Sequence, residues 1–443
     1  MIKLCFPEKK NTHKLLILLL FFTSTSCESL IRGKEDILPG QRESILLSSE
    51  LLKISDQQYS IDIPSPKNDK NWVASFKNTS NNLGNLSYSE DFIINWSTDI
   101  GVGASKDNFL TVAPILIDNL IFVVDSENKL SAVNASNGTI VWSQGLYPEQ
   151  EEPKVGFGGG LFANSGMIFY TNGFGELYAL DPYSGEIIWK KDLNIPIRSA
   201  PIANNSAVYV LNIDNQIQSF DIQSGDLIWD YNWFSDSAGF IQSSSMALNK
   251  NAIIVPYRSG EIFVFNASNG RRIWADSINR KNIKNSLSQI KDIVASPVIN
   301  NEYIVTVGSN GRVIVNNIEN GFRVWELAIS SSLTPLLIGD YIFLLGNDNI
   351  LFAITMDKGE IVWMKDLKQE YEFKKNDGFI SMLMINNKIH FFGLNGGHLV
   401  VSPEDGEISN IESNKFSNIS IPPIVVNNNL YVISDNGELT SYR

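Results

Sequence analysis

The stretch NASNGTIVW at residues 134–142 returns almost unchanged as NASNGRRIW at residues 266–274. Both copies begin with the Asn-x-Ser pattern that accepts a glycan on a eukaryotic secretory route. The same letters also describe a tight turn between two strands, because Gly takes the positive φ that other residues resist. A three-residue acceptor pattern is weak in a chain rich in Asn and Ser. A turn that repeats, in contrast, predicts a repeated structural unit.

The turn recurs along the chain, with Trp four residues after the turn Gly. Its complete copies are NASNGTIVW (134–142), DPYSGEIIW (181–189), DIQSGDLIW (221–229), NASNGRRIW (266–274), NIENGFRVW (317–325) and TMDKGEIVW (355–363). A further copy, SPEDGEISN (402–410), keeps the Gly but has Asn410 in place of Trp. Successive turn Gly residues lie 38 to 51 positions apart, which is the period of four-stranded propeller blades rather than of helical repeats.

The ends of the chain predict how the ring closes. Each turn follows an alternating segment typical of a half-buried strand, and two further strand patterns precede it, so each unit has four strands. Segment 438–442 is a third strand with no fourth after it, whereas 93–96 is a fourth strand with none before it. Pairing the two removes the exposed sheet edges that a linear array would leave. We therefore predict an all-β fold: an eight-bladed β-propeller over 91–443, closed by an N-terminal outer strand.

The repeated tryptophans are predicted to be structural residues that pack where the outer strand of one blade meets the next blade. A catalytic or stacking role is the alternative. Replacing one with a small residue is expected to cost about 3–5 kcal/mol. The set comprises Trp96, Trp142, Trp189, Trp229, Trp274, Trp325 and Trp363.

The N-terminus has the pattern of an export signal. A basic start, the short apolar run at 15–22 and small residues before Cys27 predict a secretory signal peptide over 1–26. The apolar run is too short to span a bilayer. Small residues ending at a Cys resemble a bacterial lipobox, which implies that Cys27 carries lipid. Ser24 stands three residues before Cys27, where a lipobox usually has Leu. The alternative is an ordinary signal peptide with an incidental Cys.

The rest of the N-terminal region is predicted to be a tether. Residues 27–90 are rich in Pro, Ser, Asn and charge, which favours a lipidated N-terminus followed by extended chain rather than a folded domain. The other cysteine, Cys5, lies inside the predicted signal. A structural disulfide is therefore excluded from the mature chain.

Composition excludes several kinds of chemistry. Acidic residues outnumber basic ones 48 to 35, a formal net charge of -13, so a nucleic-acid partner is not expected. Beyond the signal the histidines are His390 and His398, too few for a three-His zinc site, and we expect both at the surface or at a blade edge. The Gly-rich run at 155–160 lacks the Lys-Ser/Thr that ends a phosphate-binding loop. We expect it to be an inner strand or a loop near the central channel.

The Gly-x-x-x-Trp turn resembles the repeat of PQQ-type propellers. The quinoprotein dehydrogenases among them carry an adjacent Cys-Cys pair over the cofactor and a calcium site of carboxylate and amide ligands. This sequence has no Cys-Cys pair. The resemblance therefore implies the ring without the oxidation chemistry, and we expect neither enzymatic activity nor a cofactor nor a metal.

With its signal, Cys27, tether and ring, the exported chain resembles the outer-membrane protein assembly lipoprotein family BamB over residues 27–443. The resemblance implies a lipid-anchored scaffold on the outer membrane that faces the periplasm. It also implies that the scaffold docks on BamA within the β-barrel assembly (BAM) complex and assists unfolded outer-membrane protein clients. The rival hypothesis is a periplasmic enzyme or small-ligand-binding protein that uses the central channel.

The resemblance also implies which residues contact BamA. In that family an apolar-x-apolar-Arg segment before a Ser-Ala-Pro strand faces BamA, and Ile195, Ile197 and Arg198 match it. The family's second contact is an Asp-x-Asp segment, of which Asp292 matches the first position while Val294 replaces the second. A lone Arg among apolar residues also has the composition of an interface anchor. The alternative is an Arg that closes a local ion pair, for example with Asp292 itself.

Overall fold

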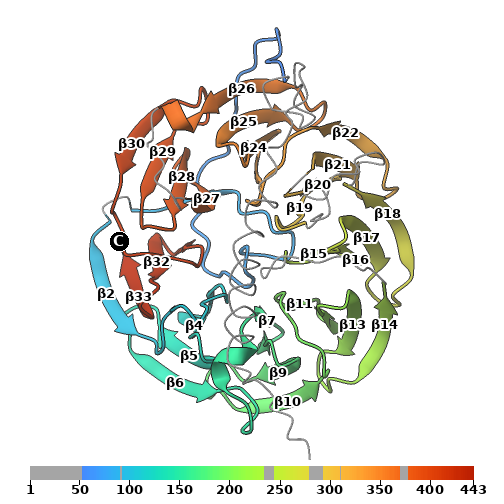
Figure 1. Ribbon diagram of the computed structural model, residues 1–443, viewed down its shortest axis with the longest axis vertical. Helices are drawn as coiled ribbons and strands as arrows, with labels where there is room; N and C mark the ends of the chain where they lie inside the picture. Colours follow the sequence, from blue (N-terminus) through green and yellow to red (C-terminus); the bar gives the residue numbers. More distant parts are fainter. Residues whose placement is uncertain (1–51, 90–91, 234–243, 279–292, 310, 370–377) are drawn as a thin grey trace, which may run out of the picture. The chain divides into compact units, whose positions relative to one another are not determined.

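The strands of the protein form a ring of eight sheets, here called blades (Figure 1). The computed structural model describes residues 52–89, 92–233, 244–278, 293–309, 311–369 and 378–443. Each blade has four antiparallel strands, which follow the chain from the centre of the ring to its rim in every blade except the last, whose outer strand comes from near the start of the chain. Blade 7 gains a fifth strand at its inner edge. The predicted all-β, eight-bladed propeller is confirmed.

The first four blades are consecutive in sequence. Blade 1 is β3 (Ile115–Ile117), β4 (Leu120–Val124), β5 (Lys129–Asn134) and β6 (Ile140–Gly145). Blade 2 is β7 (Gly160–Asn164), β8 (Met167–Thr171), β9 (Glu176–Leu180) and β10 (Ile187–Asp192). Blade 3 is β11 (Ile202–Ala203), β12 (Ala207–Leu211), β13 (Gln216–Asp221) and β14 (Leu227–Asn232). Blade 4 is β15 (Ala247–Asn249), β16 (Ala252–Pro256), β17 (Glu261–Asn266) and β18 (Arg272–Ser277).

The next three blades continue the order, and the last takes one strand from near the start of the chain. Blade 5 is β19 (Val298–Asn300), β20 (Tyr303–Val307), β21 (Val313–Asn317) and β22 (Arg323–Leu327). Blade 6 is β23 (Leu336–Ile338), β24 (Tyr341–Leu345), β25 (Ile350–Thr355) and β26 (Ile361–Asp366). Blade 7 is β27 (Phe379–Ile385), β28 (Lys388–Gly393), β29 (His398–Val401) and β30 (Ile408–Glu412), with β1 (Asn85–Leu86) added. Blade 8 is β31 (Ile424–Val426), β32 (Asn429–Ile433), β33 (Glu438–Tyr442) and β2 (Ile94–Asp99).

Blade 8 closes the ring as the sequence predicts. Strand β2 lies antiparallel to β33, with Ile94 opposite Tyr442 and Asp99 opposite Glu438. In Figure 1 the blue strand β2 lies beside the red strand β33 at the rim. The closure joins segments more than 300 positions apart and pairs the edge of β33 that a linear array would leave open.

The antiparallel order gives the ring two different faces. Turns between the first and second strands, and between the third and fourth strands, lie on one face, which we call the hairpin face. Turns between the second and third strands, and the connections to the next blade, lie on the other, which we call the connection face. The helical elements found in the described residues are the short η2 (Pro153–Gly156) and η4 (Leu367–Gln369). No helix in the described ranges is long and apolar enough to cross a membrane.

The Asn at the start of the repeated stretch closes its own turn. Strand β5 ends at Asn134, whose Oδ1 accepts a hydrogen bond from the Ser136 amide at 2.9 Å. Asn266 accepts from the Ser268 amide at 3.0 Å in the same way. Such side-chain bonds mimic a backbone turn, which is why Asn and Asp are favoured at its first position. The repetition therefore reports turn architecture.

Each repeated tryptophan joins two blades. The Trp142 indole N–H donates to the Pro182 carbonyl of the next blade at 2.9 Å, and its ring lies against the turn residue Gly185. A Cβ at Gly185 would lie 2.7 Å from Trp142 Cε3. The same donation joins Trp96 to Ala135, Trp189 to Ile222, Trp229 to Ala267, Trp274 to Ile318, Trp325 to Met356 and Trp363 to Pro403.

A β-bulge just before each tryptophan turns the side chain toward its neighbour. In blade 1, Ile140 lies opposite Val133 and Trp142 opposite Ala132, so Val141 is the extra residue. The same shift occurs in the outer pair of every blade. Val141 is exposed to 49%, because the bulge takes it out of the regular alternation. In blades 1 to 3 the apolar pair before the Trp thus lies exposed at the rim, whereas Ile361 before Trp363 is buried.

The seventh turn lacks Trp for a reason that the ring supplies. Each repeated Trp packs on the third-to-fourth-strand turn of the following blade. In blade 8 those two strands, β33 and β2, come from opposite ends of the ring and no turn joins them. Asn410 in blade 7 therefore has no turn Gly to cover, and it is exposed.

Residues 52–89, which we call the inner segment, depart from the tether expectation. The segment crosses the middle of the ring, where it appears as blue chain in Figure 1. Trp72 is 1% exposed and exchanges two backbone hydrogen bonds with Leu116 of β3. Strand β1 pairs in parallel with β27, Asn85 opposite Met384. The predicted extended tether is therefore wrong for residues 52–89, and residues 27–51 lie outside the described part.

Hydrogen bonding explains why a polar segment is buried there. The first strand of each blade presents unpaired backbone groups to the centre, and buried groups of that kind need partners. The Leu248 amide donates to the Thr79 carbonyl at 2.7 Å, and the Ile299 amide donates to the Ser80 carbonyl at 2.9 Å. The Asn81 side-chain amide donates to the carbonyls of Met246 and Pro297, in blades 4 and 5. The inner segment thus joins blades through their inner edges.

Candidate functional site

Arg198 lies on the connection face, between β10 and β11. Its guanidinium carbon is 3.9 Å from the centre of the Phe157 ring, a cation–π contact. The Phe157 ring lies 5.1 Å from the Phe109 ring, centre to centre. Three consecutive connections to inner strands, those before β3, β7 and β11, therefore converge on one surface. We call the side chains of Phe109, Phe157 and Arg198, together with Val155 and Ile195 from the same connections, the Arg198 surface.

The Gly-rich run that precedes β7 makes this packing possible. Gly158 has a φ of +107°, and a Cβ there would lie 2.7 Å from Arg198 Cδ. Its amide donates to Thr111 Oγ1 at 3.1 Å, which ties the run to the connection before β3. Gly160 begins β7, the inner strand of blade 2, as the sequence predicts for this run. A side chain at 158 would push the Arg198 stem away from the Phe157 ring.

The Arg198 guanidinium carries a charge that no carboxylate of the described residues neutralises. Burial, and then the nearby Arg258, lower the pKa of the Arg198 guanidinium, which nevertheless stays charged at neutral pH. No carboxylate in the described part of the chain forms an ion pair with Arg198. Asp292 lies outside the described residues, so the predicted contact and its ion-pair alternative both remain expectations. A half-buried cation on aromatic rings suits a partner that brings a carboxylate or carbonyl oxygens.

The structure divides the predicted apolar pair. Ile197 is completely buried, and its amide donates to the Asn172 carbonyl at 3.4 Å, so it cannot contribute to a partner surface in this conformation. Ile195 is half-buried and stays at the surface. Strand-like alternation would put positions 195 and 197 on the same face. The chain instead bends at Asn194 and Ile195, and Ile197 then pairs with Asn212, which the sequence pattern does not show.

Sequence reasoning missed the aromatic and apolar part of this surface. Phe109 is 39% and Val155 56% exposed. The sequence could have singled out Phe157, because it is the one large side chain between the glycines of the Gly-rich run. Phe109 and Val155 carry no local pattern, because only the fold brings their connections beside Arg198. Exposed apolar residues beside a cation are typical of the centre of a protein interface.

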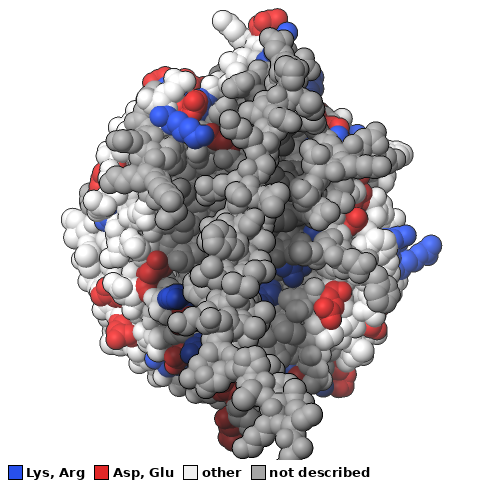
Figure 2. Space-filling view, viewed as in Figure 1, with Lys and Arg blue, Asp and Glu red and all other residues white. Residues whose placement is uncertain are grey.

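Acidic side chains are spread rather than gathered. Figure 2 shows Asp and Glu scattered round the rim of the ring, and a few Lys and Arg recessed toward its middle. The acidic side chains coloured in this view form no single patch. The feature that distinguishes the Arg198 surface is therefore its local cation and not the charge of the whole chain.

The two histidines are buried, so the expectation of surface or blade-edge positions is wrong. His390 on β28 and His398 on β29 are 5% and 1% exposed, and His390 Nδ1 lies 3.0 Å from His398 Nε2. Burial lowers the pKa of His390 to about 3 and that of His398 to about 4. The cause is their place on the middle strands of blade 7, which are buried on both sides. Both rings are neutral at neutral pH and serve packing.

A quinone cofactor of the kind that quinoprotein dehydrogenases hold does not fit the described chain. The inner segment occupies the middle of the ring, with Asn81 hydrogen-bonded to blades 4 and 5. Within the described ranges no group of three or more His, Cys, Asp or Glu is placed to hold a metal ion. The Cys-Cys pair that covers the cofactor in those enzymes is absent from the sequence. We derive no reaction step through such a group.

The sequence matches the family model described as outer membrane protein assembly factor BamB over residues 126–365. An uncharacterized protein of Rickettsia conorii is 24% identical over 341 residues, which cover 73% of this chain and 80% of that protein. BamB of Yersinia pestis is 20% identical over 351 residues, which cover 78% of this chain and 88% of that protein.

Solved structures show the same ring in two functional classes. BamB from Moraxella catarrhalis matches with a TM-score of 0.65 and 18% identity, over 79% of this chain and 100% of that chain. Quinohemoprotein alcohol dehydrogenase from Comamonas testosteroni matches with a TM-score of 0.64 and 12% identity, over 84% of this chain and 80% of that chain. Identities this low support the fold alone, so function must be argued from the site and the family.

Proposed function

The chain belongs to the family of the outer membrane protein assembly factor BamB, and from this premise we propose that it is a non-enzymatic scaffold subunit of the BAM complex. Such a subunit assists the folding and insertion of outer-membrane β-barrel proteins. A closed ring supports this role because it holds many loops at fixed relative positions without needing a reactive centre.

We propose that the scaffold docks on BamA through the Arg198 surface. The observation that carries this proposal is the stacking of Arg198 on Phe157, whose ring lies against the exposed Phe109. The guanidinium offers a planar set of donors and the rings offer apolar area, a combination found at interface hot spots. Ile195 belongs to this surface and Ile197 does not. Asp292, outside the described residues, remains a proposed contact.

Attachment to the membrane is the second part of the proposal. Residues 1–26 act as a signal peptide, and Cys27 then carries the lipid that anchors the protein to the outer membrane on its periplasmic side. Residues 28–51 supply the length between Cys27 and the ring. The support is the sequence pattern before Cys27 and the absence of any other use for a cysteine in the mature chain.

Clients are proposed to meet the rim of the ring. Outer strands such as β6 and β10 present an unpaired edge together with exposed apolar residues, among them Val141 and Ile188. An unfolded β-strand can add to such an edge through main-chain hydrogen bonds. Because the bulge interrupts the ladder at these residues, added strands would be held only over short stretches, which suits a transient contact.

A periplasmic enzyme or small-ligand binder that uses the central channel is the second candidate. The ring shared with a quinohemoprotein alcohol dehydrogenase favours it. Two observations favour a scaffold over this second candidate. The inner segment lies in the middle of the ring, and the described residues hold no group of ligands for a metal ion. Oxidation of an alcohol by the purified chain supplied with the quinone and calcium would establish this candidate instead.

Affinity capture from detergent-solubilised membranes tests the docking. We expect BamA to co-purify with the native full-length chain and Arg198→Glu to lower its recovery by about tenfold or more, the effect of losing a hot spot. Arg271→Glu is the matched control. It makes the same charge change at an exposed Arg in the blade 4 turn, on the hairpin face, and should leave recovery unchanged.

The outcomes separate the two parts of the proposal. Absence of BamA from the native sample would refute the assembly function. Equal recovery with the native chain and with Arg198→Glu would refute only the assignment of the surface. Thermal unfolding of each variant shows whether a loss of capture arises from a loss of fold.

A further inference from the structure

The outer strand of blade 6 is covered, whereas the matching strand of blade 1 is open. The same letters, Ile-Val-Trp, occupy 140–142 in β6 and 361–363 in β26. Ile140 is 45% exposed, but Ile361 is only 4% exposed. Strands β6, β10 and β14 each begin with two exposed residues, and β26 begins with a buried one. Because the letters are identical, the difference must come from what lies against the edge of blade 6.

The chain's own residues 52–55, which we call the edge segment, lie on that edge. Ile54 pairs in parallel with Ile361, and the Ser55 amide donates to the Ile361 carbonyl at 2.8 Å. Leu52 packs against the hydrophobic cluster that contains Ile361. In Figure 1 the blue start of the described chain lies outside β26, at the top of the ring. The outer edge of a blade in this protein therefore accepts an added extended segment.

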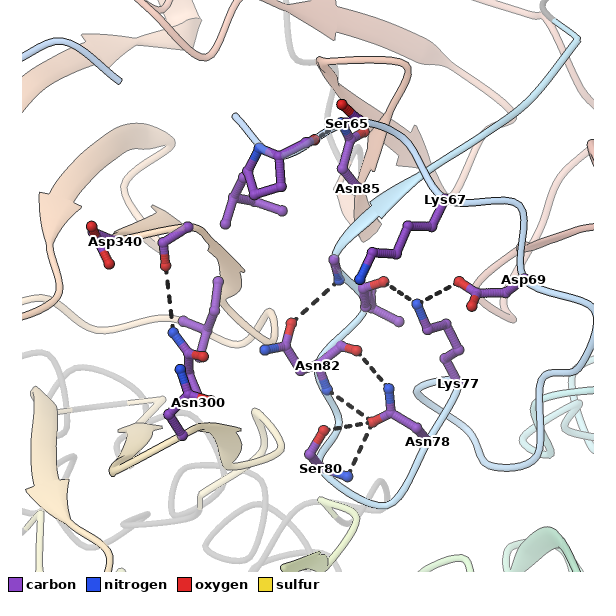
Figure 3. A pocket seen from close by; sticks show the side chains of 17 residues that line it. Ser65, Lys67, Asp69, Lys77, Asn78, Ser80, Asn82, Asn85, Asn300 and Asp340 are labelled. Atoms are coloured by element: carbon purple, nitrogen blue, oxygen red, sulfur yellow. Dashed lines mark hydrogen bonds and ion pairs between the residues drawn. The ribbon is translucent and has the colours of Figure 1, made fainter. Parts of the chain in front are cut away.

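The edge segment is held by few contacts. Among the described residues, the bond from Ser55 to Ile361 is the backbone hydrogen bond that joins it to β26. Ile54 remains 47% exposed despite the pairing. The inner segment is braced farther along by bonds of its own, such as the ion pair of Lys77 Nζ with Asp69 Oδ2 at 2.8 Å (Figure 3). Release of the edge segment thus breaks none of the bonds that hold the rest of the inner segment in the ring.

The edge segment has the pattern of an amphipathic strand. Its residues, Leu52, Lys53, Ile54 and Ser55, alternate between apolar and polar. Period-two alternation gives an extended segment one apolar side, which here faces blade 6 through Leu52. The strands of outer-membrane β-barrels alternate in the same way. An unfolded strand of that kind offers the edge of β26 the same backbone groups and the same apolar side.

We propose that the edge segment is a displaceable occupant of a strand-binding site on blade 6, and that an extended client strand with alternating apolar residues replaces it. The site is the edge of β26 from Ile361 to Trp363, and the client strand runs parallel to β26 as the edge segment does. This inference rests on the proposed role of the rim in meeting clients. It adds a selection step, because a tethered segment competes at high effective concentration and only a well-matched strand displaces it.

Cysteine capture with the full-length chain in detergent tests the proposal. The probe is a peptide with the sequence of residues 52–57 in which a cysteine, activated as its thiopyridyl disulfide, replaces Ser55. A cysteine at the edge that the probe occupies attacks this disulfide, forms a disulfide with the probe and releases pyridinethione. Val362→Cys reports on blade 6, and Val141→Cys reports on the identical stretch in blade 1. The chain without an added cysteine gives the background from Cys27.

Opening the edge should speed capture at blade 6 alone. When Leu52→Ser/Ile54→Ser is added, we expect the initial rate of capture by Val362→Cys to rise about tenfold, as for an edge that is covered about nine-tenths of the time. Capture by Val141→Cys should be the same with and without that change. Lys53→Ser alters an exposed residue of the edge segment, so it is the matched control and should change neither rate.

The outcomes separate this inference from the proposed function. A rate at Val362→Cys that opening leaves unchanged, or that Lys53→Ser raises equally, would overturn the inference while capture at Val141→Cys still supports the client role of the rim. No capture at either position of the opened chain would contradict that client role and the inference together. A probe with both apolar residues replaced by serine should be captured about tenfold more slowly, and equal capture would mean that the edge does not recognise a strand. Melting temperatures of all variants identify any loss of fold.

Discussion

A single turn glycine meets two demands at once. Gly185 has a φ of +75°, and a Cβ there would lie 2.7 Å from the Trp142 ring of the preceding blade. Gly166, in the turn between β7 and β8, has the same φ of +75° with nothing within 4 Å of its Cβ position. A substitution at Gly166 therefore tests backbone strain alone, whereas one at Gly185 tests backbone strain together with the contact between blades.

Replacing each glycine with alanine measures both demands. We expect Gly166→Ala to cost about 1 kcal/mol of unfolding free energy, the penalty of a positive φ. Gly185→Ala should cost about 1–3 kcal/mol more, because the Trp142 ring must move and weaken its bond to the Pro182 carbonyl. Urea unfolding midpoints of the two variants provide the comparison. Equal losses would mean that the contact between Gly185 and Trp142 does not hold the blades together.

The buried histidines give stability a dependence on pH with a definite sign. The pKa values of His390 and His398 are lowered in the folded chain, to about 3 and about 4, against about 6.5 in an unfolded chain. Below about pH 6.5 the unfolded chain therefore binds protons that the folded chain does not. The contribution of the pair is complete above that pH and declines as the pH falls toward the folded values.

A double variant isolates this effect. We expect the native chain to lose up to about 1.4 kcal/mol per pH unit for each histidine between about pH 6.5 and 5. His390→Leu/His398→Leu removes both partners of the hydrogen bond together and should flatten the slope. Urea unfolding at pH 7, 6 and 5 measures it, and the range stops at 5 because carboxylates such as Glu412 titrate below. The same slope in both proteins would show that the pair does not control acid stability.

At the scale of elements, repeating strands are easy to predict and the inner segment is not. Strands such as β5 and β9 are predicted by their alternating pattern and by the turn that occurs seven times. The sequence therefore predicts the order of the strands and the closure of the ring by β2. The inner segment has no repeat and the composition of a linker. Its burial depends on unpaired groups of inner strands that exist only once the ring has formed. The Arg198 surface was predicted only in part for a similar reason: Phe109 and Val155 come from other connections.

Asn81 tests whether the inner segment stabilises the ring. It is 2% exposed and its side chain donates to carbonyls in blades 4 and 5. We expect Asn81→Ala to cost about 2–4 kcal/mol, because two buried carbonyls lose their donor. Lys70→Ala, an exposed residue of the same segment, is the control and should change stability by less than about 0.5 kcal/mol. Urea unfolding measures both, and an Asn81→Ala variant as stable as the control would mean that the segment only rests in the ring.

At the scale of the whole molecule, the exception to the repeat is as informative as the repeat. Asn410 stands where Trp is expected, and the sequence alone offers no reason for it. The ring does, because blade 8 has no turn at the place that a Trp in blade 7 would cover. The fold thus accounts for the one motif position that pattern alone leaves unexplained.

The inner segment also fixes the order in which the protein can be completed. Asn85 bonds to Asn387, 302 positions later, and β2 must wait for β33. Trp72 has its partner Leu116 already in blade 1, but Asn85 and β2 remain without these later partners until blades 7 and 8 exist. Contacts of such long sequence separation slow folding. A chain interrupted before blade 7 would expose this segment and the inner strand edges together, which makes the interval between synthesis and closure the time when proteases and aggregation threaten it most.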